Sequence, residues 1–382
     1  MRTPYTIGGL LVCALSFFAC SKVSSSEGPV IKVDITSPDD VSLFDFVERV
    51  ELIQLENKTE ALFSGGRLAI SDDAFYFLHP VTRKIYRFSA DGRWISTNNK
   101  SGRGHGEFTM AEDIIFCPKD STVRILNPMG IVYRYSVPDG FEFRDTTEIH
   151  GPLRAVHEIW PLDDGKYLMY SMSEDARVYL YSPGEEIKIL NDSHPRWIEF
   201  SRYCKTGFPF YEFDGAIRYY SSFTGEIYSF NPDNSVLTPY LRWDFGKNQI
   251  SIEDIDEKAT TSDDKELRRT SHLELTKKKV APVNNVCETS RYVICGARFN
   301  RESYSVIHDK ISGADHCFAL VREGIHFSPL LAYKGDCYRY VPPEDIDYFV
   351  NESVLTDEDS RRVFRDISDD SNMIMIKYHM KR

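Results

Sequence analysis

The segment KIYRFSADG, residues 84–92, decides the fold because its pattern returns along the chain. Polar and apolar side chains alternate through KIYRFS, and the small or polar residues of a turn follow. Such alternation is typical of a half-buried β-strand, and Asn, Asp, Pro and Gly provide the backbone angles that tight turns require. The related segments are TVRILNPMG (122–130), RVYLYSPGE (177–185), EIYSFNPDN (226–234), SYSVIHDKISG (303–313) and the terminal run MIMIKYH (373–379).

The spacing of these six segments predicts a ring of small sheets. They recur at intervals of about 40 to 80 residues, and most follow a second apolar run such as AFYFLH (74–79) or DIIFC (113–117). Paired runs at such intervals are typical of a β-propeller, whose four-stranded antiparallel sheets pack radially and protect their edges. We therefore predict an all-β fold, a six-bladed β-propeller over residues 40–382.

Two stretches interrupt the strand pattern. Residues 251–279 lack alternation and are rich in charge, and residues 343–367 begin with proline and continue in a helical pattern. We predict that each forms a short helical insertion on the propeller.

The composition suits a large β-sheet core and disfavours one class of partner. The 382 residues are 42% hydrophobic and include 22 Tyr and 24 Phe, which favour the half-buried surface of a sheet. The net charge of −12 repels phosphate backbones, so we expect no nucleic-acid partner.

The N-terminus carries the pattern of an export signal. Arg2 precedes thirteen apolar or small residues, IGGLLVCALSFFA (7–19), and Cys20 follows at once. A helix of this length reaches only about 20 Å, too short for the hydrocarbon core of a bilayer. We predict a lipoprotein signal peptide over 1–19, acylation of Cys20 and a tether over 20–39, which would hold the protein on the outer membrane. The alternative is an ordinary secreted protein in which Cys20 is incidental.

Six cysteines follow Cys20. An exported chain could oxidise them, but none forms a CxxC motif and their pairing cannot be deduced from spacing. Buried free thiols are an equally good interpretation in a chain of this length. The residues are Cys117, Cys204, Cys287, Cys295, Cys317 and Cys337.

The segment SGRGHGEF (101–108) could be a ligand loop or a turn. A phosphate-binding loop needs GxxxxGK[ST], or GxGxxG leading into a helix, whereas here the strand-like DIIFC follows. Together with LIQLENKTEAL and KIYRFSADGRWI, the segment resembles the six-bladed β-propeller lipoproteins of Gram-negative bacteria, relatives of the NHL-repeat propellers. The resemblance implies a crossing from the outer strand of one blade to the inner strand of the next. Arg103 and His105, which stands where the family usually has proline, remain minor candidates for ligand binding.

The sequence offers no catalytic or cofactor signature. It contains neither a GxSxG elbow nor an HExxH motif. His308, Asp315, His316 and Cys317 could reach a metal, but a polar loop beside a core cysteine explains them more simply. We therefore predict no metal, no cofactor and no catalytic residue.

Aromatic residues near loops are the remaining candidates for a ligand face. Trp160, Trp197 and Tyr211 lie beside polar or proline residues, outside the most regular alternation. Flat aromatic faces suit sugar rings and peptide side chains, although aromatic residues also fill the wedges between blades.

These patterns favour a binding protein over an enzyme. We expect an outer-membrane lipoprotein of the cell envelope, facing the periplasm or the surface, that recognises a glycan, a peptide or a partner protein at the propeller face or channel. One alternative is a propeller lyase or hydrolase acting on polymer-derived substrates. Another is a structural subunit of an envelope complex. The sequence does not indicate the oligomeric state.

Overall fold

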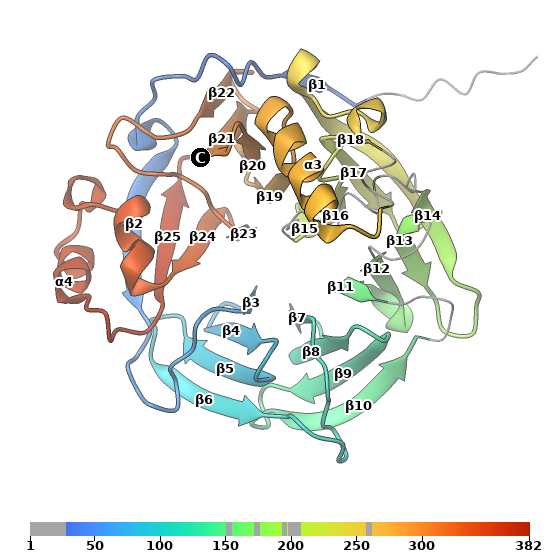
Figure 1. Ribbon diagram of the computed structural model, residues 1–382. Helices are drawn as coiled ribbons and strands as arrows, with labels where there is room; N and C mark the ends of the chain where they lie inside the picture. Colours follow the sequence, from blue (N-terminus) through green and yellow to red (C-terminus); the bar gives the residue numbers. More distant parts are fainter. Residues whose placement is uncertain (1–27, 150–154, 172–175, 193–196, 198–207, 257–261) are drawn as a thin grey trace, which may run out of the picture.

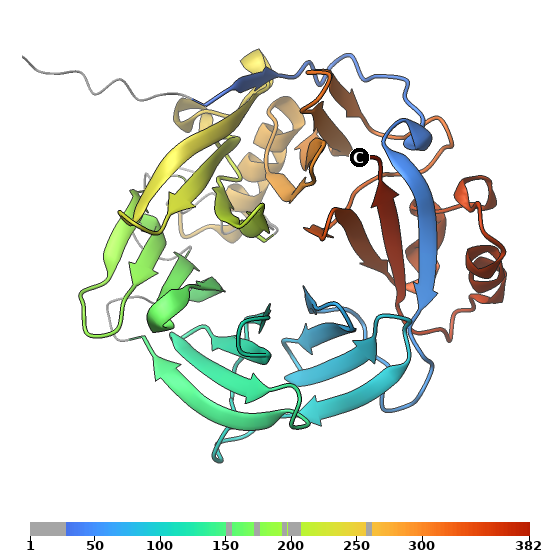
Figure 2. The same cartoon turned by 180° about the vertical axis from the view of Figure 1, so that it is seen from behind.

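Six sheets, each built around four antiparallel strands, surround a central axis like the blades of a propeller (Figure 1 and, from behind, Figure 2). The computed structural model describes residues 28–149, 155–171, 176–192, 197, 208–256 and 262–382. The predicted six-bladed β-propeller is thereby confirmed.

The first three blades follow the chain in order from the central axis outward. Within each, neighbouring strands pair antiparallel. Blade one has β3 (Arg67–Ile70), β4 (Ala74–His79), β5 (Lys84–Ser89) and β6 (Trp94–Asn99); blade two has β7 (Asp113–Cys117), β8 (Thr122–Asn127), β9 (Ile131–Ser136) and β10 (Glu142–Glu148); blade three has β11 (Val156–Pro161), β12 (Tyr167–Ser171), β13 (Ala176–Tyr181) and β14 (Lys188–Asp192).

The last three blades repeat this arrangement, and blades four and six each include a strand from the N-terminal end of the chain. Blade four has β15 (Phe210–Phe213), β16 (Ala216–Tyr220), β17 (Glu226–Asn231), β18 (Val236–Asp244) and, outermost, β1 (Val30–Lys32); blade five has β19 (Val283–Glu288), β20 (Tyr292–Phe299), β21 (Glu302–Asp309) and β22 (Asp315–Phe318); blade six has β23 (Leu331–Tyr333), β24 (Asp336–Val341), β25 (Ile374–Met380) and, outermost, β2 (Val47–Gln54).

The repeated segments of the sequence correspond mostly to the third strand of each blade. β5, β13, β17, β21 and β25 hold that place in five blades, whereas TVRILN is β8, the second strand of blade two. There the next segment, IVYRYS, also alternates and forms β9 as the third strand. A shared strand pattern therefore identified the blades without fixing the position of each strand within its blade.

The ring closes because the N-terminal side of the chain joins blade six. β2 pairs antiparallel with β25, from Val47 opposite Met380 to Gln54 opposite Ile374. Upstream, β1 pairs parallel with β18, and Ile31 and Val33 are buried there. The tether predicted over residues 20–39 therefore extends too far, since an ordered strand already begins at Val30.

Residues 33–46 form a strap between β1 and β2. The strap runs around the rim of the ring from blade four past blade five to blade six (Figure 1). The N–H of Asp39 donates to the carbonyl of Cys317 (2.7 Å), and the N–H of Arg322 donates to the carbonyl of Val41 (2.7 Å). A 3-10 turn at Leu43–Asp45 ends the strap.

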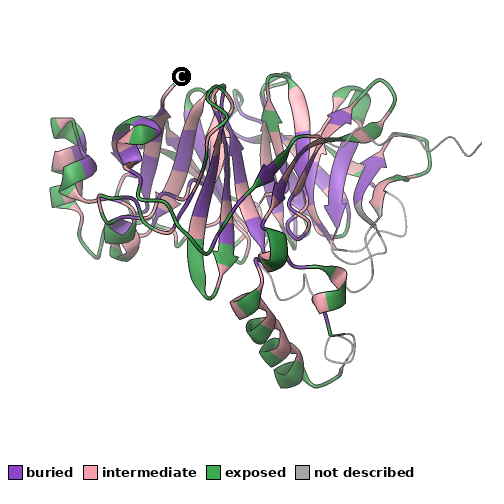
Figure 3. Ribbon diagram, turned by 90° about the horizontal axis from the view of Figure 1, so that it is seen from above, coloured by how far each residue is buried: buried purple, intermediate pink, exposed green. Residues whose placement is uncertain are grey.

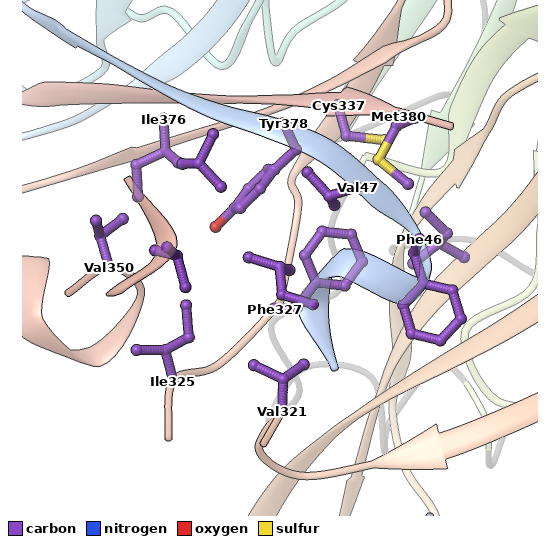
Figure 4. Packing of buried hydrophobic residues seen from close by; sticks show 14 of the residues in the cluster. Phe46, Val47, Val321, Ile325, Phe327, Cys337, Val350, Ile376, Tyr378 and Met380 are labelled. Carbon is purple, nitrogen blue, oxygen red and sulfur yellow. The ribbon is translucent and has the colours of Figure 1, made fainter. Parts of the chain in front are cut away.

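Aromatic and aliphatic side chains fill the seams between blades, as the alternation predicts. In blade six the ring of Tyr378 meets Phe327 edge-on, with 5.0 Å between ring centroids. Ile376, Val350 and Ile325 surround the pair (Figure 4). Because both faces of each sheet are covered, the apolar side chains of the sheets are removed from water at every seam.

The two predicted insertions contain helices with shorter bounds than expected. α3 (Lys265–Lys278) lies between blades four and five and projects from one face of the ring (Figure 3). α4 (Glu358–Asp366) lies at the rim of the ring and contacts β2 (Figure 1). The remaining 3-10 turns among the described residues are Asp163–Gly165, Gly246–Asn248, Ile252–Asp254, Pro343–Tyr348 and Glu352–Val354.

Five of the six cysteines discussed above lie in the described residues as buried free thiols. Cys204 lies outside those residues. Within the described part of the chain, no helix combines the length and apolar character needed to cross a bilayer.

Candidate functional site

The innermost strands of all six blades enclose one cavity on the propeller axis. β3, β7, β11, β15, β19 and β23 are each paired on one edge only, so their other edges face the axis (Figure 1). The cavity has a volume of about 600 Å³, and residues of all six strands line it. We call it the channel cavity. Its volume lies within the range of about 300–1,000 Å³ that is usual for small-ligand pockets.

The channel cavity opens where the innermost strands end. Its lining includes residues at the turns that follow these strands, among them Asp72, Asp214 and Lys334. Helix α3 lies toward the other face, because its Thr276 carbonyl accepts a hydrogen bond from Asn300 (3.2 Å) at the far end of β20. The mouth of the cavity is therefore not covered by α3.

One side of the channel cavity holds two carboxyl groups and one guanidinium. Nη1 of Arg67 on β3 lies 3.0 Å from Oε1 of Glu158 on β11. Asp113 on β7 accepts a hydrogen bond from the N–H of Ile159 on the unpaired edge of β11 (3.2 Å). Both acids are buried, at 3% and 4% exposure. We call Arg67, Asp113 and Glu158 the Arg67 cluster; it links the innermost strands of blades one, two and three.

The Arg67 cluster contains more acid than base, and its pKa values reflect this. Burial raises the pKa of Asp113 to about 6, against the opposing effect of Arg67. Burial also raises the pKa of Glu158 well above its usual range, again against Arg67, and Asp113 adds to the rise. A single guanidinium cannot compensate two buried carboxylates, so as the pH rises the cluster still holds a proton in the mildly acidic range, where exposed carboxyl groups have already lost theirs.

The other side of the channel cavity holds one carboxylate among four donors. Oε1 of Glu288 on β19 accepts from the hydroxyl of Tyr240 (2.6 Å) and from Nζ of Lys310 (3.0 Å). Its Oε2 accepts from the hydroxyl of Tyr211 on β15 (3.1 Å) and lies 4.0 Å from Nε of Arg218. The Glu288 side chain is 0% exposed. We call these five residues the Glu288 cluster; it joins blades four and five.

The two tyrosines of the Glu288 cluster stay protonated donors. Burial, followed by Glu288, raises the pKa of Tyr211 well above its usual range. Burial and the hydrogen bond to Glu288 raise the pKa of Tyr240 to about 12. Arg218 also lies over the ring of Tyr240, 4.0 Å from the ring centroid.

The structure brings two of the predicted ligand residues into the channel cavity. Trp160 and Tyr211 both line it. Trp197 does not belong to that lining: its ring stacks on Phe223 at 5.2 Å, beside Ile250 and Ile255. The prediction that these three aromatic residues share one ligand face is therefore not matched by their positions, because Trp197 fills a separate core cluster.

Arg103 and His105 lie elsewhere, in a shallow outer hollow of about 730 Å³ beside the glycine segment. This segment crosses from β6 to β7, as the resemblance implied. Both side chains are exposed, and the ring of His105 meets Phe143 edge-on at 4.6 Å. Gly106 has a φ of 70°, and a Cβ there would lie 2.5 Å from the Phe143 ring, so only glycine fits this position.

The charged residues of the channel cavity were missed by the sequence analysis. Asp113 and Glu158 stand in strands that are mostly apolar, DIIFC and VHEIWP, and Glu288 ends VNNVCE. An acid in a strand that must be buried on both faces was the available signal, since such a group requires a partner. The sequence could not show that these acids meet at one axis.

Two further predictions concern the lipidation site and a possible metal site. Cys20, the predicted lipidation site, lies outside the described residues. Nδ1 of His308 pairs with Asp315 at 2.7 Å, and the described residues contain no group of three or more His, Cys, Asp or Glu side chains arranged to hold a metal ion.

Comparison with known proteins supports the fold. The family model described as Domain of unknown function (DUF4934) matches residues 28–379. No curated protein matches the chain. A protein from Bacteroides fragilis NCTC 9343 described as exported shares the fold with a TM-score of 0.73 at 15% identity, over 92% of this chain and 100% of the other. A member of the DUF4221 family from Bacteroides vulgatus has a TM-score of 0.53 at 7% identity, over 88% and 97% of the two chains.

A virginiamycin B lyase from Staphylococcus aureus is also similar, with a TM-score of 0.42 at 10% identity over 76% of this chain and 80% of the other. A likeness at this level carries no inference about activity. The six-bladed fold that the glycine segment indicated is confirmed by the sheets themselves, whereas the lipoprotein character of that resemblance stays a prediction.

Proposed function

The chain belongs to the family described as Domain of unknown function (DUF4934), and we propose that it is an exported, lipid-anchored propeller that binds a ligand in its channel cavity without catalysis. One observation carries the binding role: a single cavity of about 600 Å³ is built by the innermost strands of all six blades. A rigid ring presents such a pocket preformed, which lowers the ordering cost of binding.

The lining of the channel cavity is suited to recognition. Partly exposed aromatic rings, such as Trp160 and Phe213, provide flat apolar surface. The buried charges behind them are largely committed to one another, since Glu288 already accepts from Tyr211, Tyr240 and Lys310. These ionic groups connect different blades around the channel cavity.

The export and anchoring part of the proposal derives from the N-terminal sequence. The apolar run over 7–19 and Cys20 have the order expected of a lipoprotein signal. The similar Bacteroides fragilis protein is itself described as exported. Metabolic labelling with a palmitate analogue in a Gram-negative host should label the wild-type chain and not Cys20→Ala; equal labelling of both would refute lipidation.

The binding role is tested with the mature protein purified in detergent. Isothermal titration against panels of peptides and oligosaccharides should find a ligand whose binding is lost in Trp160→Ala. The matched control is Trp94→Ala on the outer strand β6, far from the axis. A ligand that binds Trp160→Ala and wild type equally would place the site outside the channel cavity.

A second candidate function is acid–base catalysis on a polymer-derived substrate. Asp113 and Glu158 both line the channel cavity, and burial raises the pKa of each. A carboxyl group that keeps its proton near neutral pH can protonate a leaving group. Turnover of an oligosaccharide by wild type that disappears in Glu158→Gln would favour this function over binding alone.

A further inference from the structure

The wall of the channel cavity repeatedly combines an aromatic ring, a cation and a carboxylate. Three cations of the chain lie over rings of the wall, at 4.7, 4.0 and 5.9 Å from the ring centroids. Each of these cations also pairs with a carboxylate, at 3.0, 3.0 and 2.5 Å. The three sets, in the same order, are Phe208–Arg67–Glu158, Phe213–Lys310–Glu288 and Tyr333–Lys334–Asp72.

Trp160 differs from these rings in that no cation of the described residues lies over it. It lines the same cavity and is partly exposed. Trp presents the strongest aromatic face for a positive charge. Trp160 packs against the core cluster that contains Phe210.

Glu212 carries a carboxylate and lines the channel cavity together with Trp160. Alternate residues of a strand share a face, so Glu212 faces the same seam as Phe210 on β15. Its cross-strand partner is Ile217, which packs against the same core cluster as Trp160. Glu212 is exposed and lines the channel cavity. Lys119, whose charge it influences, is already hydrogen-bonded to Asp163.

We propose that the ligand of the channel cavity carries a primary amine or a guanidinium, as the side chains of a basic peptide do, and that this cation occupies the space between Trp160 and Glu212. The ring and the carboxylate then repeat, with an external cation, the arrangement that the wall forms three times with its own cations. This inference rests on the proposed binding role of the channel cavity. It predicts that the ligand is a basic peptide and not a neutral glycan.

The test compares probes that differ only in charge. The mature protein in detergent is titrated with acetyl-Gly-Gly-Lys-Gly-Gly-amide, with the same peptide carrying norleucine in place of lysine, and with maltotetraose. We expect the lysine peptide to bind at least about tenfold more tightly than the norleucine peptide. Raising the salt from about 50 to about 500 mM should weaken the lysine peptide alone.

Two substitutions locate the charge within the cavity. Glu212→Gln and Trp160→Leu should each weaken the affinity for the lysine peptide about tenfold. Glu212→Gln should leave any affinity for the norleucine peptide unchanged, whereas Trp160→Leu can lower it. The matched controls are Glu142→Gln on the exposed outer strand β10 and Trp94→Leu on β6, which should change nothing.

The outcomes separate this inference from the proposed function. If the norleucine peptide or maltotetraose binds as tightly as the lysine peptide, and Trp160→Leu abolishes that binding, the channel binds a ligand but the cationic assignment is wrong. The assignment is also wrong if the lysine peptide binds and Glu212→Gln leaves its affinity unchanged. If none of the three probes binds at about 10 mM, where even weak sites fill, the cationic assignment fails, and the binding role then depends on the wider panel.

Discussion

The Arg67 cluster and the Glu288 cluster face the same cavity with opposite balances of charge. In the first, Asp113 and Glu158 share a single guanidinium. In the second, one carboxylate is shared by Lys310, Arg218 and two phenols. Buried carboxyl groups that lack a cation can take up a proton near neutral pH, whereas a guanidinium such as that of Arg218 stays charged when its carboxylate is removed. The two sides of the channel should therefore respond differently to mutation and to pH.

The largest effect is expected where the single carboxylate is removed. Glu288→Gln keeps the size of the side chain but leaves Lys310 and Arg218 without their counter-charge in the wall. We expect a loss of about 3 kcal/mol in the free energy of unfolding, measured by urea denaturation at pH 7.5. The exposed Glu142→Gln is the control, and a loss as small as the control's would remove the distinction between the two clusters.

Removing the cation of the first cluster should cost less and depend on pH. Arg67→Met leaves Asp113 and Glu158 buried without their guanidinium. We expect a loss of about 2 kcal/mol at pH 7.5 and clearly less at pH 5, because the two carboxyl groups are then protonated. The loss in Glu288→Gln should persist at pH 5, since lysine and arginine remain cations. Equal losses at both pH values in Arg67→Met would contradict the proton-holding role of the cluster.

A smaller effect probes one donor of the Glu288 cluster. Tyr240→Phe removes the hydroxyl that donates to Oε1 of Glu288 at 2.6 Å. We expect a loss of about 1.5 kcal/mol, the usual value for a hydrogen bond to a charged acceptor. Tyr348→Phe is the control because that side chain is 61% exposed. An unchanged unfolding free energy in Tyr240→Phe would mean that the other three donors satisfy Glu288 alone.

At pH 4.5 the smallest effect is expected at Asp113, where the substitution should instead change how the unfolding free energy depends on pH. Its pKa is about 6 in the folded protein and near 4 in an unfolded chain. Between these values the folded state binds more protons, so the unfolding free energy falls as the pH rises. Asp113→Asn has no proton to lose. Its unfolding free energy should differ from that of wild type by less than about 0.5 kcal/mol at pH 4.5. Between pH 4.5 and 7 it should not show the decrease that the proton of Asp113 causes in wild type.

Urea denaturation from pH 4.5 to 7.5 measures both parts of that prediction. The difference in unfolding free energy between Asp113→Asn and wild type should shift in favour of the variant as the pH rises. A difference that stays constant across this range would show that Asp113 releases its proton at the same pH in the folded and unfolded states. Ile159 can still donate its N–H in the variant, because the side-chain amide of asparagine keeps a carbonyl oxygen as acceptor.

The sequence predicted the ring far better than the contents of its channel. Alternation followed by a turn is a local property, so KIYRFS and its relatives identified the blades from a few residues each. The tether was drawn too long because β1 has only three residues, Val30–Lys32, and its partner β18 lies about 210 residues further along the chain. Short edge strands of this kind leave little local signal.

The channel depends on where distant strands meet. Trp160 and Tyr211 were selected as aromatic residues near loops, and both line the cavity, but the same criterion selected Trp197, which packs on Phe223. Arg67 and Glu158 form a pair across 91 positions of sequence. Such a pairing follows from the closure of the ring and from no local pattern, which is why the charged wall was missed.

The strap over residues 33–46 determines how the ring would bear mechanical load. A pull on the chain from its N-terminal side first reaches β1, whose three residues pair parallel with β18. The force then passes to the hydrogen bonds that Asp39 and Val41 make with blade five and its following loop, before it reaches β2. If these attachments detach one after another, the seven-residue pairing of β2 with β25 still keeps the circle shut. Under such a pull, β1 and the strap would separate from the rim before tension reaches the strand pairing that closes the propeller.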